Sequence, residues 1–372
     1  MDHYNLFQQL YCLSMVPNLV AAHQGSEEAL QDALKKSLNE LLPQLPGNWS
    51  ISWGPRVYKV KRKDPSKGGP DNVWLAAVDE TQKICVVAIA GTALNSLADI
   101  YQDLWVHKVV DFNAWVDQWS PQGIPKPKTS TPDQDNGSAL AYCAKGTCIG
   151  VWNVLNNVST EAGEGTRIDQ YLSSLDSSYT IVVAGHSLGG ALSPIAALGL
   201  VKANLVGNHT VKVLPSAGVS PGNDVLAADY AAIFPKDPPS SEDYQVFNAG
   251  YYNAFDVVPQ AWSINSDDDR NLPNIVDTIL HCEGDLKNFV NFLLALAVGQ
   301  SKKSQIRYTP LPGQRFAGPP PPAPVRSWDQ VTGILGTQHG SAYWDEIGIS
   351  EFINQFYKKF SKRVGAQGSA TS

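Results

Sequence analysis

Apolar residues recur along the chain in two distinct patterns. Short runs in which almost every residue is apolar, such as 84–90 and 180–185, predict strands that are buried on both faces of a sheet. Stretches with apolar residues three and four positions apart, such as 30–42 and 151–158, predict helices with one buried face. Because the two patterns alternate, we predict an α/β fold with a mostly parallel central sheet flanked by helices.

Further elements follow from the same two patterns. The expected strands are 49–55, 56–62, 73–79, 210–218 and 244–252, and the expected helices are 166–175, 191–203, 285–299 and 352–360. Two stretches lack a clear period: 105–140 is rich in aromatic residues and then in Pro, Ser and Asp, and 263–338 contains the run PPPPAP. We therefore expect a single domain over 1–364 with these two stretches as cap-like insertions. The sequence GAQGSATS predicts a disordered tail at 365–372.

Composition and charge narrow the classes of function. With 43% hydrophobic and 17% charged residues, the chain has the composition of a compact globular protein. Its 28 basic residues are outnumbered by 35 acidic ones and form no basic run, which argues against nucleic-acid binding. The longest apolar stretch, 289–298, is about half the length of a transmembrane helix. The N-terminus lacks a positive segment before its apolar residues, so we expect no signal peptide; a cytoplasmic location is the default, with the compartment left open.

The five cysteines are too few for a disulfide scaffold, and their odd number leaves at least one thiol free. Cys85 lies in an apolar strand and is expected to pack in the core. Cys143 and Cys148 are compatible with either a local disulfide or two free thiols. No second cysteine pair follows at the spacing of a zinc site, so we expect neither a bound metal nor a cofactor.

A candidate nucleophile lies in Gly185-His186-Ser187-Leu188-Gly189, which matches the nucleophile-elbow pattern G-x-S-x-G. An apolar strand precedes it and an apolar helix follows, and this is the context that the motif requires. The sharp turn projects the serine hydroxyl above the sheet, and the two glycines keep side chains from colliding where strand and helix approach. The Leu188 amide, at the helix N-terminus, then points toward a developing oxyanion. The alternative is a glycine-rich turn with an incidental serine.

A serine hydroxyl needs a base to take its proton, and the base needs an acid to orient it. In α/β-hydrolases the chain order is Ser, then the acid, then His. We favour His339 as the base, because its loop GTQHGSAYW has small neighbours and leaves room for the acid before it. His281 is the main competitor, and His209 follows Ser187 too closely for an acid to lie between them.

For the acid we favour Asp256, which follows an apolar strand pattern, in the kind of loop where ligand-facing groups of an α/β sheet belong. Asp267–Asp269 form a charge run that is either a solvated loop or a weak cation site. Asp277 and Asp285 lie beside apolar runs and are interpreted as surface charges. Thr92, directly after a buried strand, is the candidate for a second oxyanion donor.

Taken together, these residues resemble the fungal-type, or class 3, lipase family. The matching blocks, in order, are AIAGTALNSLADIYQDL, VVAGHSLGGAL, GVSPGN, NAFDVVP and HGSAYW. The resemblance implies an α/β-hydrolase fold with Ser187 as nucleophile, Asp256 as acid and His339 as base. It also implies that the amides of Thr92 and Leu188 form the oxyanion hole.

The chain departs from the family pattern in three places. Ala90 stands where the family usually has an arginine before Gly-Thr. The stretch 105–140 is inserted, and the interval between Asp256 and His339 is longer than the family leads us to expect. Both additions are expected to cover the site, so that ordinary relatives are a poor guide to the substrate.

The expected activity is serine-dependent hydrolysis of a carboxylic ester through an acyl-enzyme. Trp105, Trp115 and Trp119, with the helix around 289–298, either cover an acyl chain or form the core of an insertion. A lipase for triacylglycerol or long-chain acyl esters is favoured, with transient contact to a lipid interface. The alternative is a feruloyl or other aromatic-acid esterase, and a more remote one is a non-catalytic binding protein with the hydrolase fold.

Overall fold

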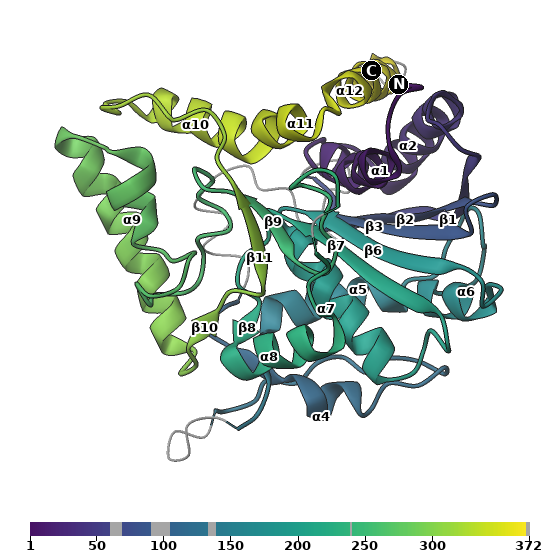
Figure 1. Cartoon of the computed structure of the whole chain (residues 1–372), viewed down its shortest axis with the longest axis horizontal. Coiled ribbons are helices and arrows are strands. Elements are labelled where there is room, and N and C mark those ends of the chain that lie inside the picture. The colour runs from purple at the N-terminus through teal and green to yellow at the C-terminus, as the bar shows by residue number, and fades with distance from the viewer. Residues whose placement is uncertain (60–68, 91–104, 133–138, 239, 370–372) are drawn as a thin grey trace.

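A mixed seven-stranded sheet forms the centre of the molecule (Figure 1). The computed structural model describes residues 1–59, 69–90, 105–132, 139–238 and 240–369. The strand order is β1 (Trp49–Tyr58), β2 (Asn72–Asp79), β3 (Ile84–Ala90), β6 (Thr180–His186), β7 (Thr210–Ser216), β9 (Gly250–Asn253) and β11 (Gly313–Phe316). The two pairings among the first three strands are antiparallel and all the later ones are parallel. The predicted α/β fold with a mostly parallel sheet is therefore confirmed.

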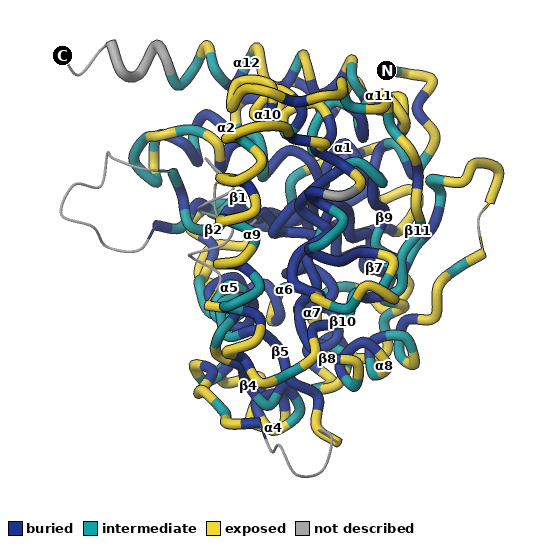
Figure 2. Tube along the Cα trace, turned by 90° about the vertical axis from the view of Figure 1, so that its left-hand side faces the viewer, coloured by how far each residue is buried: buried dark blue, intermediate teal, exposed yellow. Residues whose placement is uncertain are grey.

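Different helices cover the two faces of this sheet. On one face lie α1 (Leu6–Ala21), α2 (Glu27–Leu41) and α12 (Ser350–Ser369), and on the other lie α5 (Lys145–Asn156), α6 (Ile168–Ser174) and α7 (Leu188–Lys202). In β3, Val87 and Ile89 face the core beneath α7, whereas Val86 and Ala88 face the core beneath α1. The strands are apolar throughout because each serves both cores, and Figure 2 shows them buried at the centre.

A second, four-stranded antiparallel sheet lies beside the first and has no counterpart among the predicted elements. Its order is β10 (Tyr308–Thr309), β8 (Gly222–Asn223), β5 (Tyr142–Ala144) and β4 (Val109–Asp111), accompanied by α4 (Phe112–Val116) and α8 (Asp224–Ile233). These strands are two or three residues long, and such lengths carry too little alternation for a strand signal.

The tryptophans of the first insertion have two different placements. Trp115 and Trp119 are buried in the core beneath α7, and a side chain at Gly199 of α7 would collide with the Trp119 ring. Gly199 lies about 16 Å along α7 from Leu188, since a helix rises about 1.5 Å per residue. For these two residues the core-packing alternative therefore holds. Trp105, by contrast, is half exposed.

The second insertion supplies both sheet and helix. Besides β10 and β11, it contains η2 (Ile275–Leu280), α9 (Gly284–Lys303), α10 (Trp328–Gly336) and the start of η3 (Thr337–Ser341), a π-helical turn followed by α11 (Ala342–Ile347). Figure 1 shows α9 and α10 as an arm beside the main body. Because β11 pairs with β9, this stretch is partly a structural component of the central sheet.

Several predicted boundaries were wrong. Where two strands were expected at 49–55 and 56–62, the described residues form a single strand, β1, whose register shifts twice; positions 60–62 lie outside the described residues. The short helix η1 (Leu42–Gln44) precedes β1. Only the end of the strand expected at 244–252 pairs, as β9. Helix α1 was missed because it is buried on most sides and lacks a single apolar stripe. The tail was expected to be disordered from 365, whereas α12 extends as far as Ser369.

Candidate active site

The nucleophile elbow is a sharp turn between β6 and α7. Ser187 follows the last residue of the strand and precedes the first of the helix, with φ 61° and ψ −128°. This conformation is costly for a residue with a side chain, so the surroundings must hold it in place. A Cβ at Gly189 would collide with the carbonyl oxygen of Ile89 in β3, and one at Gly185 would collide with the backbone of Gly189. The two glycines allow the close approach that makes the turn possible.

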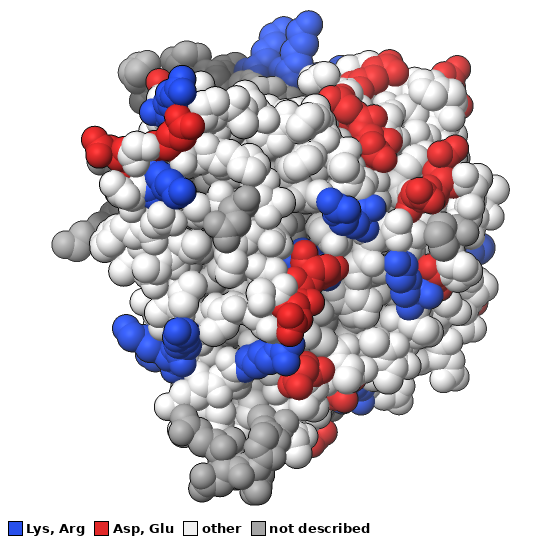
Figure 3. Space-filling view, turned by 60° about the vertical axis from the view of Figure 1, so that its left-hand side comes forward, with Lys and Arg blue, Asp and Glu red and all other residues white. Residues whose placement is uncertain are grey.

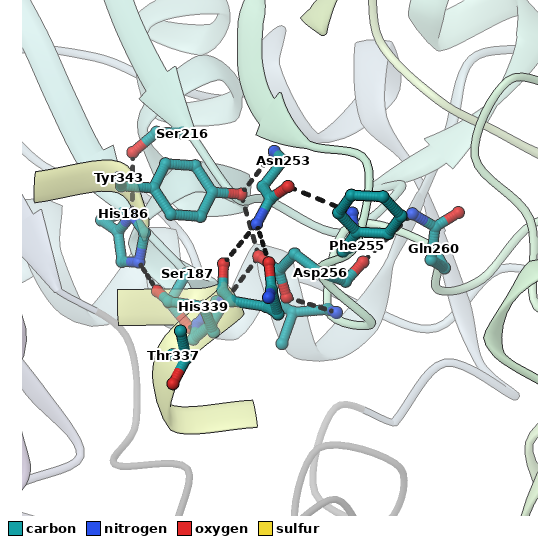
Figure 4. Close-up of polar contacts among 12 residues, drawn as sticks. His186, Ser187, Ser216, Asn253, Phe255, Asp256, Gln260, Thr337, His339 and Tyr343 are labelled. Atoms are coloured by element: carbon teal, nitrogen blue, oxygen red, sulfur yellow. Dashed lines mark hydrogen bonds and ion pairs between the residues drawn. The ribbon is translucent and has the colours of Figure 1, made fainter. Parts of the chain in front are cut away.

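Of the three residues predicted to work together, His339 lies between the other two and within hydrogen-bonding distance of both (Figure 4). His339 Nε2 is 2.8 Å from Ser187 Oγ, and His339 Nδ1 is 2.8 Å from Asp256 Oδ2. Because a carboxylate only accepts, Nδ1 carries the proton and Nε2 is left to accept one from the serine hydroxyl. The side chains come from the β6–α7 turn, the loop after β9 and the η3 turn.

Asp256 is fully buried and receives two further hydrogen bonds. Its Oδ1 accepts the Val258 amide at 3.0 Å, and its Oδ2 accepts the Tyr343 hydroxyl at 2.9 Å. The Tyr343 oxygen in turn accepts the Asn253 amide at 3.0 Å. Burial, reinforced by the nearby Asp256 charge, raises the pKa of Tyr343 well above its usual range, so its hydroxyl remains a donor. Tyr343 belongs to the HGSAYW block, but its sequence position alone indicated no role for it.

Asn253 joins the acid loop to the segment that carries His339. Its Nδ2 donates to the backbone oxygen of Gln338 at 3.0 Å and to the Gln338 side chain at 2.7 Å. Its Oδ1 accepts the amides of Phe255 at 3.1 Å and Gly318 at 3.0 Å. A single buried side chain therefore connects three loops that are far apart in the sequence. Neither periodicity nor spacing signals this role.

His186 connects the elbow to the same segment from the other side. Its Nε2 is 2.9 Å from the backbone oxygen of His339, and its Nδ1 is 2.9 Å from Ser216 Oγ. A carbonyl only accepts, so Nε2 carries the proton and Nδ1 accepts from the serine. Burial, and next the charge of the nearby His339 when protonated, lower the pKa of His186 well below its usual value. The ring is therefore neutral, and its two hydrogen bonds hold the elbow and the His339 backbone together.

The remaining candidates divide into those placed elsewhere and those outside the described residues. Leu188 opens α7, as the motif requires, whereas Thr92 lies outside the described residues. His281 is exposed at the end of η2, and the His209 ring lies near the carbonyl oxygens of Val206 and Asp176. Within the described part of the chain, neither ring is hydrogen-bonded to Asp256 or Ser187.

The acidic run is a hydrogen-bonded loop. Asp268 accepts from Ser263 and pairs with Arg307, and Asp269 accepts from Tyr252 and pairs with Arg270. The described residues contain no group of three or more His, Cys, Asp or Glu that could hold a metal ion. Asp285 is exposed in the first turn of α9, while the side chain of Asp277 lies outside what the structure describes.

All five cysteines are free and buried. For Cys143 and Cys148, which were compatible with a disulfide, the structure therefore has two thiols. Within the described part of the chain, no helix is long and apolar enough to cross a bilayer.

Comparisons with known proteins agree with this architecture. A family model described as lipase (class 3) matches residues 118–265, a range that includes Ser187 and Asp256 and ends before His339. The crystal structure of M37 lipase superposes with a TM-score of 0.68 at 19% sequence identity, covering 95% of this chain and 97% of that one. Nonglycosylated LIP2 lipase from Yarrowia lipolytica gives a TM-score of 0.44 at 20% identity, over 70% of this chain and 76% of that one. No curated protein sequence matches the chain.

Proposed function

We infer that this chain is a member of the class 3 lipase family, and we propose that it hydrolyses carboxylic esters of long acyl chains through Ser187, His339 and Asp256. The observation that carries the proposal is the series of two hydrogen bonds from Ser187 through His339 to Asp256. It recurs in serine hydrolases because a hydroxyl is a poor nucleophile without a base.

In the proposed reaction, Ser187 Oγ attacks the ester carbonyl while His339 Nε2 takes its proton. Asp256 holds the imidazole so that Nε2 faces the serine, and it stabilises the imidazolium that forms. The imidazolium then protonates the leaving alcohol, and an acyl-enzyme remains. Water, activated by the same nitrogen, attacks the acyl-enzyme and releases the fatty acid.

The negative oxygen of the tetrahedral intermediate requires hydrogen-bond donors fixed in advance. We assign the amide of Leu188 to this role, because it lies at the N-terminus of α7, where amides and the helix dipole favour an anion. Thr92 is proposed as the second donor from its place directly after β3. The loss of one such donor typically costs about 2.7–4 kcal/mol of transition-state stabilisation.

Labelling by a fluorophosphonate probe tests the nucleophile. We expect the wild-type protein to be labelled and Ser187→Ala to be unlabelled. Ser193→Ala is the matched control, because this buried serine of α7 has no hydrogen-bond partner for its hydroxyl among the described residues. A wild-type protein that is not labelled would contradict the proposed mechanism and favour a binding protein.

Substrate preference is tested with p-nitrophenyl esters of increasing chain length, alongside methyl ferulate. A long-chain preference, with triacylglycerol hydrolysed from an emulsion, is the expected result for a lipase in transient contact with a lipid interface. A preference for the ferulate would instead identify an esterase for aromatic acids.

A further inference from the structure

The outward side of α9 exposes large apolar side chains. Phe289 is 49% exposed, Phe292 58% and Leu296 48%. A helix advances about 100° per residue, so these three share one stripe along its surface. Val290 and Ala297, on the opposite side, are buried against the protein. Helix α9 is therefore apolar on the side that packs and also on the side that faces outward.

The charge pattern of α9 is as unusual as its exposure. Residues 288–301 contain no Asp, Glu, Lys or Arg, and Lys302 and Lys303 follow at the C-terminal end of the helix. A helix that is apolar all round is expected in a buried or lipid environment. Other exposed large hydrophobic residues, such as Val158 and Tyr357, lie outside this arm of the molecule and need no explanation.

A neighbouring helix extends the surface. Trp328, at the start of α10, is 39% exposed and packs edge-on against Phe289, with ring centroids 5.7 Å apart. We call the surface formed by Phe289, Phe292, Leu296 and Trp328 the α9/α10 apolar face. Figure 3 shows a wide area without charged side chains on this side of the molecule, bordered by charged residues.

The apolar face is also connected to the active site. Helix α10 begins at Trp328 and continues directly into the η3 turn, which carries His339. At about 1.5 Å per residue, roughly 16 Å of helix separates the two residues. A surface that rests on this face therefore lies one short helix away from the proposed base.

We propose that the α9/α10 apolar face docks the protein onto the surface of a lipid aggregate, and this inference rests on the proposed lipase function. Helices that lie in a lipid interface bury an apolar stripe in the boundary between headgroups and acyl chains. The exposed Lys302 and Lys303 at the end of the stripe fit the phosphates of anionic headgroups.

Vesicle binding tests the proposal separately from catalysis. Binding is measured by cosedimentation with phosphatidylcholine vesicles, with and without phosphatidylglycerol, in a Ser187→Ala background so that no ester is cleaved. Phe292→Ser/Leu296→Ser should weaken binding about tenfold or more, because each side chain loses its transfer from water to lipid. Tyr357→Ser is the matched control: its side chain is 49% exposed, but on α12, and its binding should equal that of the parent.

A charge variant tests the role of the two lysines. Lys302→Glu/Lys303→Glu should weaken binding several-fold on vesicles that contain phosphatidylglycerol and much less on neutral ones. With Ser187 intact, the Phe292→Ser/Leu296→Ser variant should lose activity on emulsified triacylglycerol while keeping its rate on soluble p-nitrophenyl butyrate.

The possible outcomes separate the two proposals. Vesicle binding that is unchanged in Phe292→Ser/Leu296→Ser overturns the docking face, whatever the activity. A parent protein that sediments as a dimer, and becomes monomeric in this variant with unchanged vesicle binding, assigns the face to a contact between copies and also overturns it. Vesicle binding through this face by a protein that hydrolyses no ester would support docking and refute the proposed function.

Discussion

The proposed nucleophile, Ser187, and its two proposed partners are held in place by different means. Ser187 is fixed by backbone shape: a tight turn in which glycines let β3, β6 and α7 approach each other closely. Asp256 and His339 are fixed by side chains, because Asn253 and Tyr343 connect the loops on which they lie. The elbow half of the site therefore depends on glycines, which have no side chain. The half that contains Asp256 and His339 depends on hydrogen bonds between side chains and loops.

This difference determines how each half should respond to mutation. Closely packed backbone segments cannot move apart to make room for a new atom. Adding a single methyl group at the elbow should therefore disrupt both folding and catalysis. Hydrogen bonds among loops can be lost one at a time, so removing them should reduce activity in steps.

The largest effect is expected from Gly189→Ala. The added Cβ collides with the carbonyl oxygen of Ile89, and neither backbone can move without shifting Ser187. We expect a loss of about 3 kcal/mol or more in the free energy of unfolding. In the folded fraction, kcat should fall about a hundredfold or more, because the nucleophile is displaced. Urea denaturation and assays on p-nitrophenyl butyrate measure both.

Gly299→Ala is the matched control for this substitution. Gly299 also lies within a helix, but a Cβ there meets nothing within 4 Å. Alanine should stabilise the helix by up to about 1 kcal/mol and leave kcat unchanged. If Gly189→Ala behaves like this control, the elbow does not depend on a side-chain-free backbone.

A large effect is also expected from Asn253→Ala on the side-chain half of the site. The substitution removes both bonds to Gln338 and leaves the half-buried amides of Phe255 and Gly318 without their acceptor. We expect about 3 kcal/mol of lost stability and a kcat about a hundredfold lower, because Asp256 and His339 no longer keep their relative positions.

Asn248→Ala separates loss of stability from loss of positioning. Asn248 is also buried, and it bonds the amide of Val213 and the backbone oxygen of Pro235, away from the triad. This variant should lose comparable stability but keep its kcat at a temperature where it remains folded. An equal loss of kcat in both variants would show that Asn253 acts only through global stability.

The contrast also explains what the sequence could predict. The features of the elbow lie within a few consecutive residues, so the pattern around Ser187 and the apolar runs that flank it identify the strand, the turn and the helix together. The candidates Asp256 and His339 follow from chain order and from the resemblance to class 3 lipases. The structural requirements of the elbow are thus met by residues that are adjacent in the sequence, and a sequence pattern can reveal them.

The bracing of the acid and base follows from no local pattern. Asn253 contacts Gln338, 85 positions away, and His186 contacts His339, 153 positions away. These contacts arise only once β9, β6 and the η3 turn are packed together. The small sheet was missed for a related reason: its two- and three-residue strands are defined by their partners and not by alternation.

A moderate effect is expected from Tyr343→Phe. The ring remains to fill its space, but Asp256 loses one donor and the Asn253 amide loses its acceptor. A hydrogen bond to a charged group is worth about 1.5–3 kcal/mol, so we expect stability to fall by about that much and kcat to fall about tenfold. Thermal melting and single-turnover kinetics measure the two effects.

Tyr230→Phe is the control for removing a buried hydroxyl. Among the described residues, no hydrogen-bond partner exists for the Tyr230 hydroxyl, so its removal should leave kcat unchanged and stability unchanged or slightly higher. A Tyr343→Phe variant with wild-type kcat would mean that the second bond to Asp256 has no part in positioning the acid.

The smallest effect is a pH dependence that comes from His186, the side chain that joins the two halves of the site. In the unfolded chain a histidine titrates at about 6.5. In the fold, burial lowers the pKa of His186 well below that value, so the native ring stays neutral while the unfolded one takes up a proton. Its contribution to stability is therefore complete above about pH 6.5 and decreases as the pH falls, by up to about 1.4 kcal/mol per pH unit.

His186→Gln lacks the titration, and its amide can still donate to the His339 carbonyl, so its free energy of unfolding should fall less steeply between about pH 7 and 5. Urea denaturation of both proteins across this range measures the difference. If the free energy of unfolding of both proteins fell equally with pH, the His186 ring would take up a proton in the native state. That result would contradict a neutral ring that links the elbow to His339.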